Sequence, residues 1–163
     1  NARFCAEALG GRHAEIWRAA CQRFLSGRPA AGGAVAPGEE GLQLLVEAAH
    51  VLHDLTRAVM PEQMMANLDA YLQGFLSLLA LPFDPAAAEL PLQLCASLSA
   101  WIAHHKELLQ PFASRIVEAI WNLLVALDDR EENDPLVTSG LGVLSAVACQ
   151  DWAPSPFEDP KVL

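Results

Sequence analysis

Lysine is scarce in this sequence of 163 residues, where only Lys106 and Lys161 are present. Lys and Arg together number 10 against 20 Asp and Glu, which gives a formal net charge of −10. A chain of this sign repels the phosphate backbone of nucleic acids, so direct nucleic-acid binding is not expected. A basic protein partner suits the charge better. The alternative is that the negative charge only keeps the protein soluble.

Long hydrophobic runs are also missing. The longest apolar stretches, at 75–83 and 94–103, fall short of the roughly 18–20 residues that a membrane-spanning helix needs, so we expect no membrane insertion. The opening residues have no apolar core of the signal-peptide type. Because the first residue is Asn1 rather than Met, we expect the sequence to be part of a longer protein.

The four cysteines form no CxxC pair and lie far apart, at Cys5, Cys21, Cys95 and Cys149. Most of them have apolar neighbours in helix-compatible sequence, which is typical of free, buried thiols in a reducing compartment. No Asn-x-Ser/Thr acceptor for glycosylation is present.

Motifs for catalysis and metal binding are absent from the sequence as well. There is no glycine-rich phosphate loop and no HExxH zinc motif, so we expect neither an enzyme nor a cofactor. His50, His53 and Asp54 can share one helical face, and His104 and His105 form a second pair. A zinc site needs three or four converging ligands, and nothing is spaced to complete either set, so solvated or helix-capping histidines are expected.

Helical periodicity is the strongest positive feature, and it predicts an all-α chain with no strand. Apolar residues recur at helical spacing, and breakers predict loops at 26–39, 82–90, 128–134 and 150–160. The helices predicted between them cover 12–25, 40–58, 61–81, 91 to about 106, 111–127 and 135–149. Proline lacks an amide proton, so the prolines at 61, 91, 111 and 135 should each lie in the first turn of a helix.

The spacing of these helices indicates a repeat. The helices that begin at 40, 91 and 135 start 51 and then 44 residues apart, and they alternate with helices that begin at 61 and 111. A pair of helices at this period is typical of HEAT or armadillo repeats, which stack into an α-solenoid, although a helical bundle has the same periodicity. The predicted organisation is the end of a preceding repeat and a flexible Gly/Ala/Pro loop at 1–39, HEAT repeats at 40–90 and 91–134, and the start of the next repeat with a loop at 135–163.

The apolar spacing also predicts which side chains are buried. One predicted stripe contains Met65, Leu68, Leu72, Phe75 and Leu79, and a second contains Leu94, Leu98, Trp101 and Ile102. Trp121 lies beside Ile120 and one turn from Val117 and Leu124, so we expect it to be buried between paired helices. Small residues at Ser139, Gly142 and Ala146 predict close helix packing.

An acidic segment is the one conspicuous polar feature. Asp128, Asp129, Glu131 and Glu132 lie within five residues and form the candidate partner-binding site, because such a patch attracts basic proteins. Asp134, just before Pro135, is the expected N-cap of the next helix. The alternative is a solvated turn whose acidic residues only favour the start of that helix.

Three stretches carry a resemblance to a known family. The run Ala-Ile-Trp-Asn-Leu-Leu-Val at 119–125, the run Asp-Pro-Leu-Val-Thr-Ser at 134–139 and Phe157-Glu158-Asp159 resemble successive elements of the exportin-2 family in the importin-β superfamily. The resemblance extends over about 42–163. It implies a right-handed HEAT-repeat α-solenoid whose second helices, 61–81 and 111–127, line the concave face.

The same resemblance implies a function. It indicates a segment from the N-terminal third of a nuclear export receptor that binds importin-α together with Ran-GTP and shuttles between nucleus and cytoplasm. No contact residue of the family transfers to a position in this chain. The alternatives are another importin-β-type receptor or HEAT scaffold with a different cargo, and a helical accessory domain of a larger enzyme.

Overall fold

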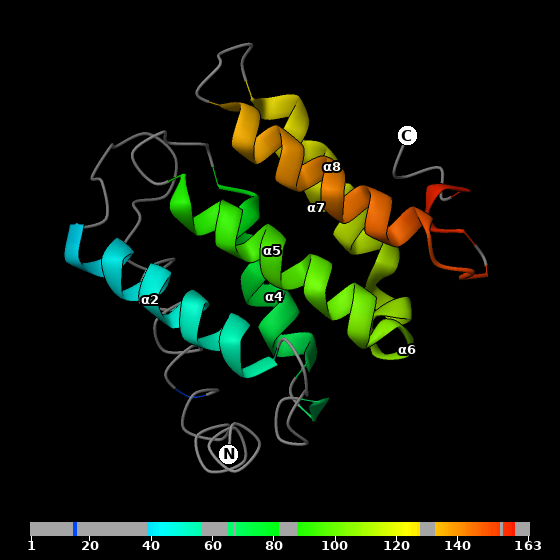
Figure 1. Cartoon of the computed structure of the whole chain (residues 1–163), viewed down its shortest axis with the longest axis horizontal. Coiled ribbons are helices and arrows are strands. Elements are labelled where there is room, and N and C mark those ends of the chain that lie inside the picture. Colours follow the sequence, from blue (N-terminus) through cyan, green and yellow to red (C-terminus); the bar gives the residue numbers. More distant parts are fainter. Residues whose placement is uncertain are drawn as a thin grey trace. The chain divides into compact units, whose positions relative to one another are not determined.

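The computed structural model describes residues 15, 39–56, 65–66, 68–81, 88–127, 133–153 and 155–158. All regular secondary structure within these residues is helical, which confirms the all-α prediction (Figure 1). The elements are α2 (Glu39–Thr56), α4 (Leu68–Leu79), α5 (Glu89–His104), α6 (Lys106–Leu109), the 3-10 turn η2 (Gln110–Phe112), α7 (Ala113–Ala126), α8 (Asp134–Ala148) and the 3-10 turn η4 (Pro156–Glu158).

The chain divides into two compact units, 1–78 and 79–163. Apart from Glu15, the predicted helix at 12–25 lies outside the described residues, as does Pro61. Of the loop predicted at 26–39, only Glu39 is described, and it is the first residue of α2 and not a loop residue. The repeat boundaries inferred from the helix spacing stay predictions. Among the described residues, no helix is both long enough and apolar enough to cross a membrane.

Helices α2 and α4, which lie in the first unit except for Leu79 at the end of α4, each bury apolar residues. Leu45, Val46 and Ala49 are the described buried residues of α2. Four members of the stripe predicted for the next helix are buried in α4, namely Leu68, Leu72, Phe75 and Leu79. The fifth, Met65, is 40% exposed, so its predicted burial is wrong. The physical reason is that Ala66 is a turn residue before α4 begins, so the helical spacing does not carry back to Met65.

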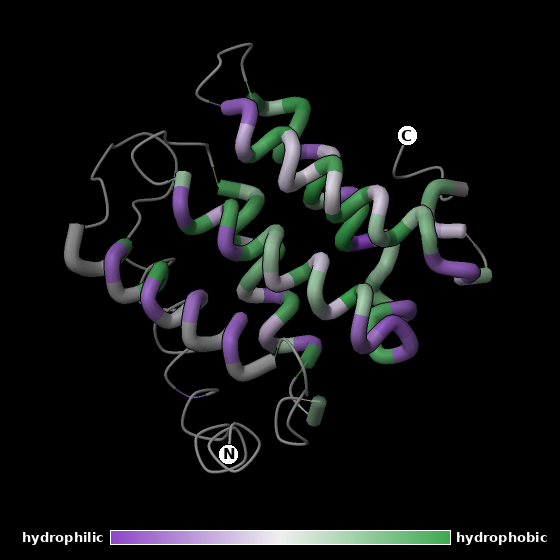
Figure 2. The backbone as a smooth tube through the Cα atoms, viewed as in Figure 1, coloured by the Kyte–Doolittle hydropathy of each residue, from purple (hydrophilic) through white to green (hydrophobic). Residues whose placement is uncertain are grey.

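The second unit is built around α5, whose predicted apolar stripe is confirmed. Leu94, Leu98, Trp101 and Ile102 are all fully buried. The helix ends at His105, which leaves helical geometry at φ −133° and ψ 37° while its N–H donates to the Trp101 carbonyl oxygen at 2.7 Å. The chain then continues through α6 and η2 into α7. Figure 2 shows hydrophobic residues recurring along α5 and α7 with hydrophilic residues between them.

Helix α8 packs against both α5 and α7, so the core of this unit lies among three helices that are separate in sequence. Leu136, Gly140, Val143 and Val147 are the buried residues of α8. After α8, the segment predicted as a loop at 150–160 contains η4, which packs against α7. The segment is therefore part of the packed unit, with Trp152 and Pro156 buried.

Prolines mark the helix starts as predicted where the structure describes them. Pro91 is the third residue of α5, Pro111 lies within η2 at the entrance to α7, and Pro135 is the second residue of α8. In the first turn a backbone N–H has no intrahelical acceptor, so its absence costs nothing there.

Candidate functional site

The amphipathic helix α7 and the segment that follows it contain the residues on which the functional predictions rest. One face of α7 is buried through Ala113, Ile116, Val117, Ile120 and Leu123. The opposite face is exposed and carries Glu118, Trp121, Asn122, Val125 and Ala126. This second face carries one carboxylate, one amide and the apolar side chains of Trp121, Val125 and Ala126.

The start of α7 is fixed by the turn before it. Pro111 sets the backbone of η2, and the guanidinium carbon of Arg115 lies 5.8 Å from the centre of the Phe112 ring. A cation over an aromatic face at this distance is attracted to it. The contact joins the first turn of α7 to η2.

Of the two described glycines of α8, Gly140 and not the predicted Gly142 packs closely against α7. A Cβ atom at position 140 would lie 2.9 Å from Leu124 Cδ2 and 3.6 Å from Ile120 Cγ2, whereas a Cβ at 142 would meet nothing within 4 Å. Ser139 and Ala146 are half-buried, and Gly142 is exposed. The prediction of close packing was right for this helix but wrong for Gly142. Gly140 and Gly142 are two residues apart, so they differ by about 200° around the helix and lie on nearly opposite sides of it.

The end of α7 leads into the acidic segment. Leu127 is extended, at φ −75° and ψ 138°, and its N–H donates to the Leu124 carbonyl oxygen at 3.3 Å. The four candidate contact residues, Asp128, Asp129, Glu131 and Glu132, lie outside the described residues. The structure therefore leaves the site prediction untested.

The N-cap of α8 is Asn133, not Asp134 as predicted. Asn133 is 2% exposed and has helical dihedral angles, and Asp134 is the first helical residue and is exposed. No side chain makes a capping hydrogen bond at this end of α8. The Asp134 carboxylate still interacts favourably with the positive end of the helix dipole.

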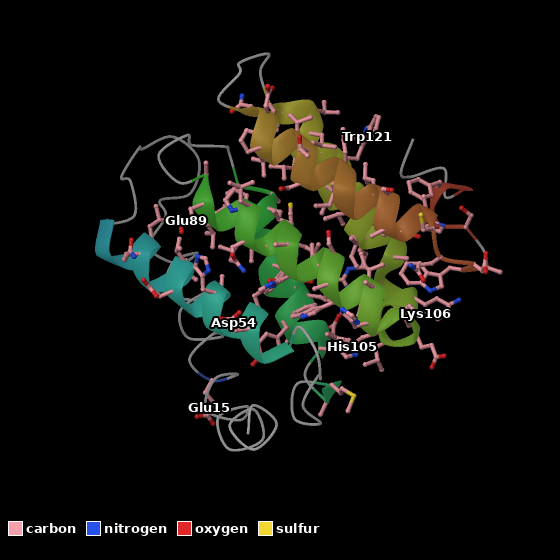
Figure 3. All side chains as sticks on the ribbon, viewed as in Figure 1. Glu15, Asp54, Glu89, His105, Lys106 and Trp121 are labelled. Atoms are coloured by element: carbon pink, nitrogen blue, oxygen red, sulfur yellow. The ribbon has the colours of Figure 1, made fainter. Side chains whose placement is uncertain are left out.

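Trp121 is 47% exposed, so the prediction that it is buried is wrong. It lies at the edge of the α7–α8 pair (Figure 3). Trp121 follows the fully buried Ile120, and a single residue step turns about 100° around the helix, away from the core. The fully buried tryptophan of the described residues is Trp101 in α5.

The described titratable side chains form no reactive cluster. No group of three or more His, Cys, Asp or Glu among them could hold a metal ion. His104 and His105 touch edge to face with ring centres 6.4 Å apart, and both lie at the end of α5, where the sequence predicted them. His50 and Asp54 are exposed on α2, and His53 is half-buried.

The two described cysteines differ sharply, and neither is in a disulfide. Cys95 is fully buried, and this burial raises the pKa of its thiol from 9.0 to about 12. A thiol with such a pKa is protonated at neutral pH and is a poor nucleophile. Cys149 is exposed, so the prediction of a buried thiol is wrong there.

Comparison with known proteins identifies the family of the chain. The Cse1 family model matches residues 39–163, which includes all the described helices. The chain belongs to the Cse1 family. Cse1 proteins have the importin-β type of helical-repeat solenoid fold, in agreement with the predicted fold class.

The curated relatives of this Cse1-family chain carry one name. Exportin-2 of Xenopus laevis is 30% identical over 125 residues, which is 71% of this chain and 13% of the relative. Exportin-2 of Drosophila melanogaster is 29% identical over 129 residues, covering 73% of this chain and 13% of the relative. The chain thus corresponds to a small part of these relatives. No solved structure gave a significant match.

Proposed function

We propose that this chain is a segment of a nuclear export receptor that binds importin-α together with Ran-GTP and returns importin-α to the cytoplasm. The protein would then shuttle between nucleus and cytoplasm and act as a transport receptor, not as an enzyme. The observation that carries the proposal is the Cse1 match over 39–163 together with identity of about 30% to exportin-2 of two distant animals.

The charge and the exposed side chains support this proposal. The net charge of −10 favours a basic partner over an acidic one. The exposed face of α7 offers Glu118 and Asn122 for protein contact. These features suit a receptor that works by binding alone.

The family-level test replaces the matched segment of Xenopus exportin-2 by residues 39–163 of this chain. The readout is capture of importin-α by the chimera in the presence of Ran loaded with GTP or with GDP. We expect capture with Ran-GTP and loss of it with Ran-GDP. A matched control carries an unrelated helical segment of the same length, and it should capture little importin-α with either nucleotide.

Two outcomes would contradict the proposal. Equal capture of importin-α with Ran-GTP and with Ran-GDP would indicate a receptor or scaffold of another kind. A folded chimera that behaves like the control would show that this segment does not substitute for the exportin-2 segment.

Within the segment, we propose that Asp128, Asp129, Glu131 and Glu132 contact the partner. Their support is charge: four carboxylates follow α7 within five residues, and importin-α carries a basic segment by the family resemblance. Attraction of this kind extends over about 8 Å at physiological salt, so it raises the association rate more than the affinity.

The test of this contact replaces the four residues by Asn and Gln in the chimera. Asp134 is kept, because its carboxylate favours the start of α8. We expect slower association with importin-α at low salt, and convergence of the two proteins at high salt. If the unaltered and the substituted chimera associate with importin-α at the same rate even at low salt, the acidic segment is a solvated turn and not a contact.

A further inference from the structure

Ser155 is the one serine or threonine in the sequence that is followed directly by a proline, Pro156. It lies between α8 and η4, and its backbone has no regular secondary structure. The other described serines and threonines all lie in helices. A proline disfavours helical geometry in the residue before it, which explains why this one hydroxyl lies outside a helix.

The conformation and the sequence at Ser155 suit a phosphate acceptor. A protein kinase binds the acceptor segment of its substrate in an extended conformation, because the hydroxyl must align with the γ-phosphate of ATP. A hydroxyl inside a helix is not presented in this way. Proline-directed kinases also require a proline directly after the acceptor. Among the residues that the structure describes, Ser155 alone meets both conditions.

The Ser155 side chain belongs to a turn that is packed against the rest of the second unit. Ser155 itself is half-buried, Pro156 is buried, and η4 packs against α7. Trp152, three residues earlier, is 9% exposed. The Phe157 N–H donates to Ser155 Oγ at 3.4 Å, which is long for a hydrogen bond and hence weak. A new charge at Ser155 would therefore act where the chain after α8 is attached to α7.

A phosphate on Ser155 is incompatible with this packed turn. The group carries a charge of about −1.5 to −2 at pH 7, and a half-buried site cannot supply the water that such a charge needs. Asp151, Glu158 and Asp159 lie within four residues of it in sequence, whereas the nearest basic residue in sequence is Lys161. Repulsion between like charges adds to the cost of desolvation. Both effects favour a state in which the turn moves out into water.

We propose that Ser155 is the phosphate acceptor of a proline-directed protein kinase, and that its phosphorylation detaches η4 from α7. In the transfer, Ser155 Oγ forms a bond to the γ-phosphorus of MgATP. The bond from that phosphorus to the β,γ-bridging oxygen breaks, and ADP leaves with the electron pair. The hydroxyl proton passes to the catalytic aspartate of the kinase. The proposal does not depend on the proposed role in export.

The first test measures phosphate incorporation in the folded Xenopus chimera. The chimera is incubated with MgATP and a purified mitogen-activated protein kinase, which is proline-directed, and its peptides are mapped by mass spectrometry. We expect phosphate on Ser155 and none on Thr138 or Ser145, which are exposed but lie in α8. Pro156→Ala keeps the acceptor hydroxyl and removes the proline, so modification of Ser155 should fall by about tenfold or more.

The second test measures whether the phosphate detaches η4. Hydroxyl-radical footprinting compares the oxidation of Trp152 in the chimera before and after treatment with kinase and MgATP, with fully buried Trp101 as the internal reference. We expect the oxidation of Trp152 to increase severalfold and that of Trp101 to stay unchanged. Ser155→Ala, treated in the same way, is the matched control and should show no increase.

Four outcomes would overturn the proposal. Phosphate on Ser155 only after denaturation of the chimera would show that the folded protein does not present this residue. Equal modification of the Pro156→Ala variant would show that the proline does not direct the kinase. Unchanged oxidation of Trp152 in the phosphorylated chimera would leave η4 on α7. Faster oxidation of Trp101 as well would indicate general unfolding instead of local detachment. None of these readouts uses importin-α, so failure of the proposed export function leaves them interpretable.

Discussion

Helices α5 and α7 each carry a tryptophan in the second unit, but they place it differently. Trp101 is fully buried in α5, whereas Trp121 is 47% exposed on α7. Trp101 follows Leu98 by three residues and Leu94 by seven, so it lies at the centre of the apolar face. Trp121 is one residue after Ile120, which turns it about 100° away from that face. Apolar neighbours in sequence are therefore a weaker guide to burial than angular position.

The position of α8 also contributes to the difference in burial between Trp101 and Trp121. Helix α8 packs against both α5 and α7. On α7, Leu124 and Ile120 lie against Gly140 of α8. That contact covers one flank of α7 and leaves the side chain of Trp121 in solvent. Substitutions on the two helices should therefore differ in energy.

The largest effect is expected for Trp101→Ala. Removal of a fully buried indole leaves a cavity in the core of the second unit, which should lower the free energy of unfolding by about 3–5 kcal/mol. Urea unfolding of the 163-residue chain, followed by circular dichroism at 222 nm, measures the loss. A loss below about 1 kcal/mol would show that α5 is not the centre of this core.

The next largest effect is expected at the α7–α8 contact. Gly140→Leu must fit a side chain where even a Cβ would lie 2.9 Å from Leu124 Cδ2, so we expect a loss of about 1–3 kcal/mol. The matched control is Gly142→Leu, where a Cβ meets nothing within 4 Å. Since leucine is a better helix former than glycine, this control should gain up to about 1 kcal/mol. Equal effects at the two positions in urea unfolding would contradict the packing of α8.

A smaller effect is expected from the pH dependence of Cys95. Its pKa is about 12 in the folded chain and 9.0 without burial, so the unfolded chain loses this proton first as the pH rises. The contribution of Cys95 to stability is complete below pH 9 and decreases between pH 9 and 12. Between pH 8 and 10 this amounts to about 1 kcal/mol.

The measurement for Cys95 is urea unfolding at pH 8 and pH 10, compared with Cys95→Ala. The variant removes the titrating thiol, so its stability should fall less over this interval than that of the unaltered chain. All other titrating groups are common to both proteins and cancel in the comparison. An identical fall in the two proteins would show that the thiol is not desolvated.

The smallest effect is expected for Trp121→Ala in the 163-residue chain. A side chain that is 47% exposed leaves no closed cavity, so the loss should stay near 0.5 kcal/mol, about the size of other surface changes. Urea unfolding beside Trp101→Ala gives the comparison directly. A loss as large as that of Trp101→Ala would place Trp121 in the core after all.

The sequence by itself determined the helices and most of their buried faces. Helical spacing located the stripe of Leu94, Leu98 and Trp101, and it did so because residues three and four apart share one side of a helix. Proline marked the starts of α5 and α8, because its missing N–H is harmless only there. The Ala-Ile-Trp-Asn-Leu-Leu-Val run pointed to the family that the match over 39–163 identifies.

Tertiary structure alone decided which side of each helix a neighbour covers. Periodicity says which residues share a face, but the exposure of Trp121 and Cys149 depends on where α8 and η4 lie. The close contact at Gly140 rather than Gly142 has the same cause, since only the position of Leu124 in space distinguishes the two glycines. A helix fixes angles within itself, whereas burial also requires a second helix.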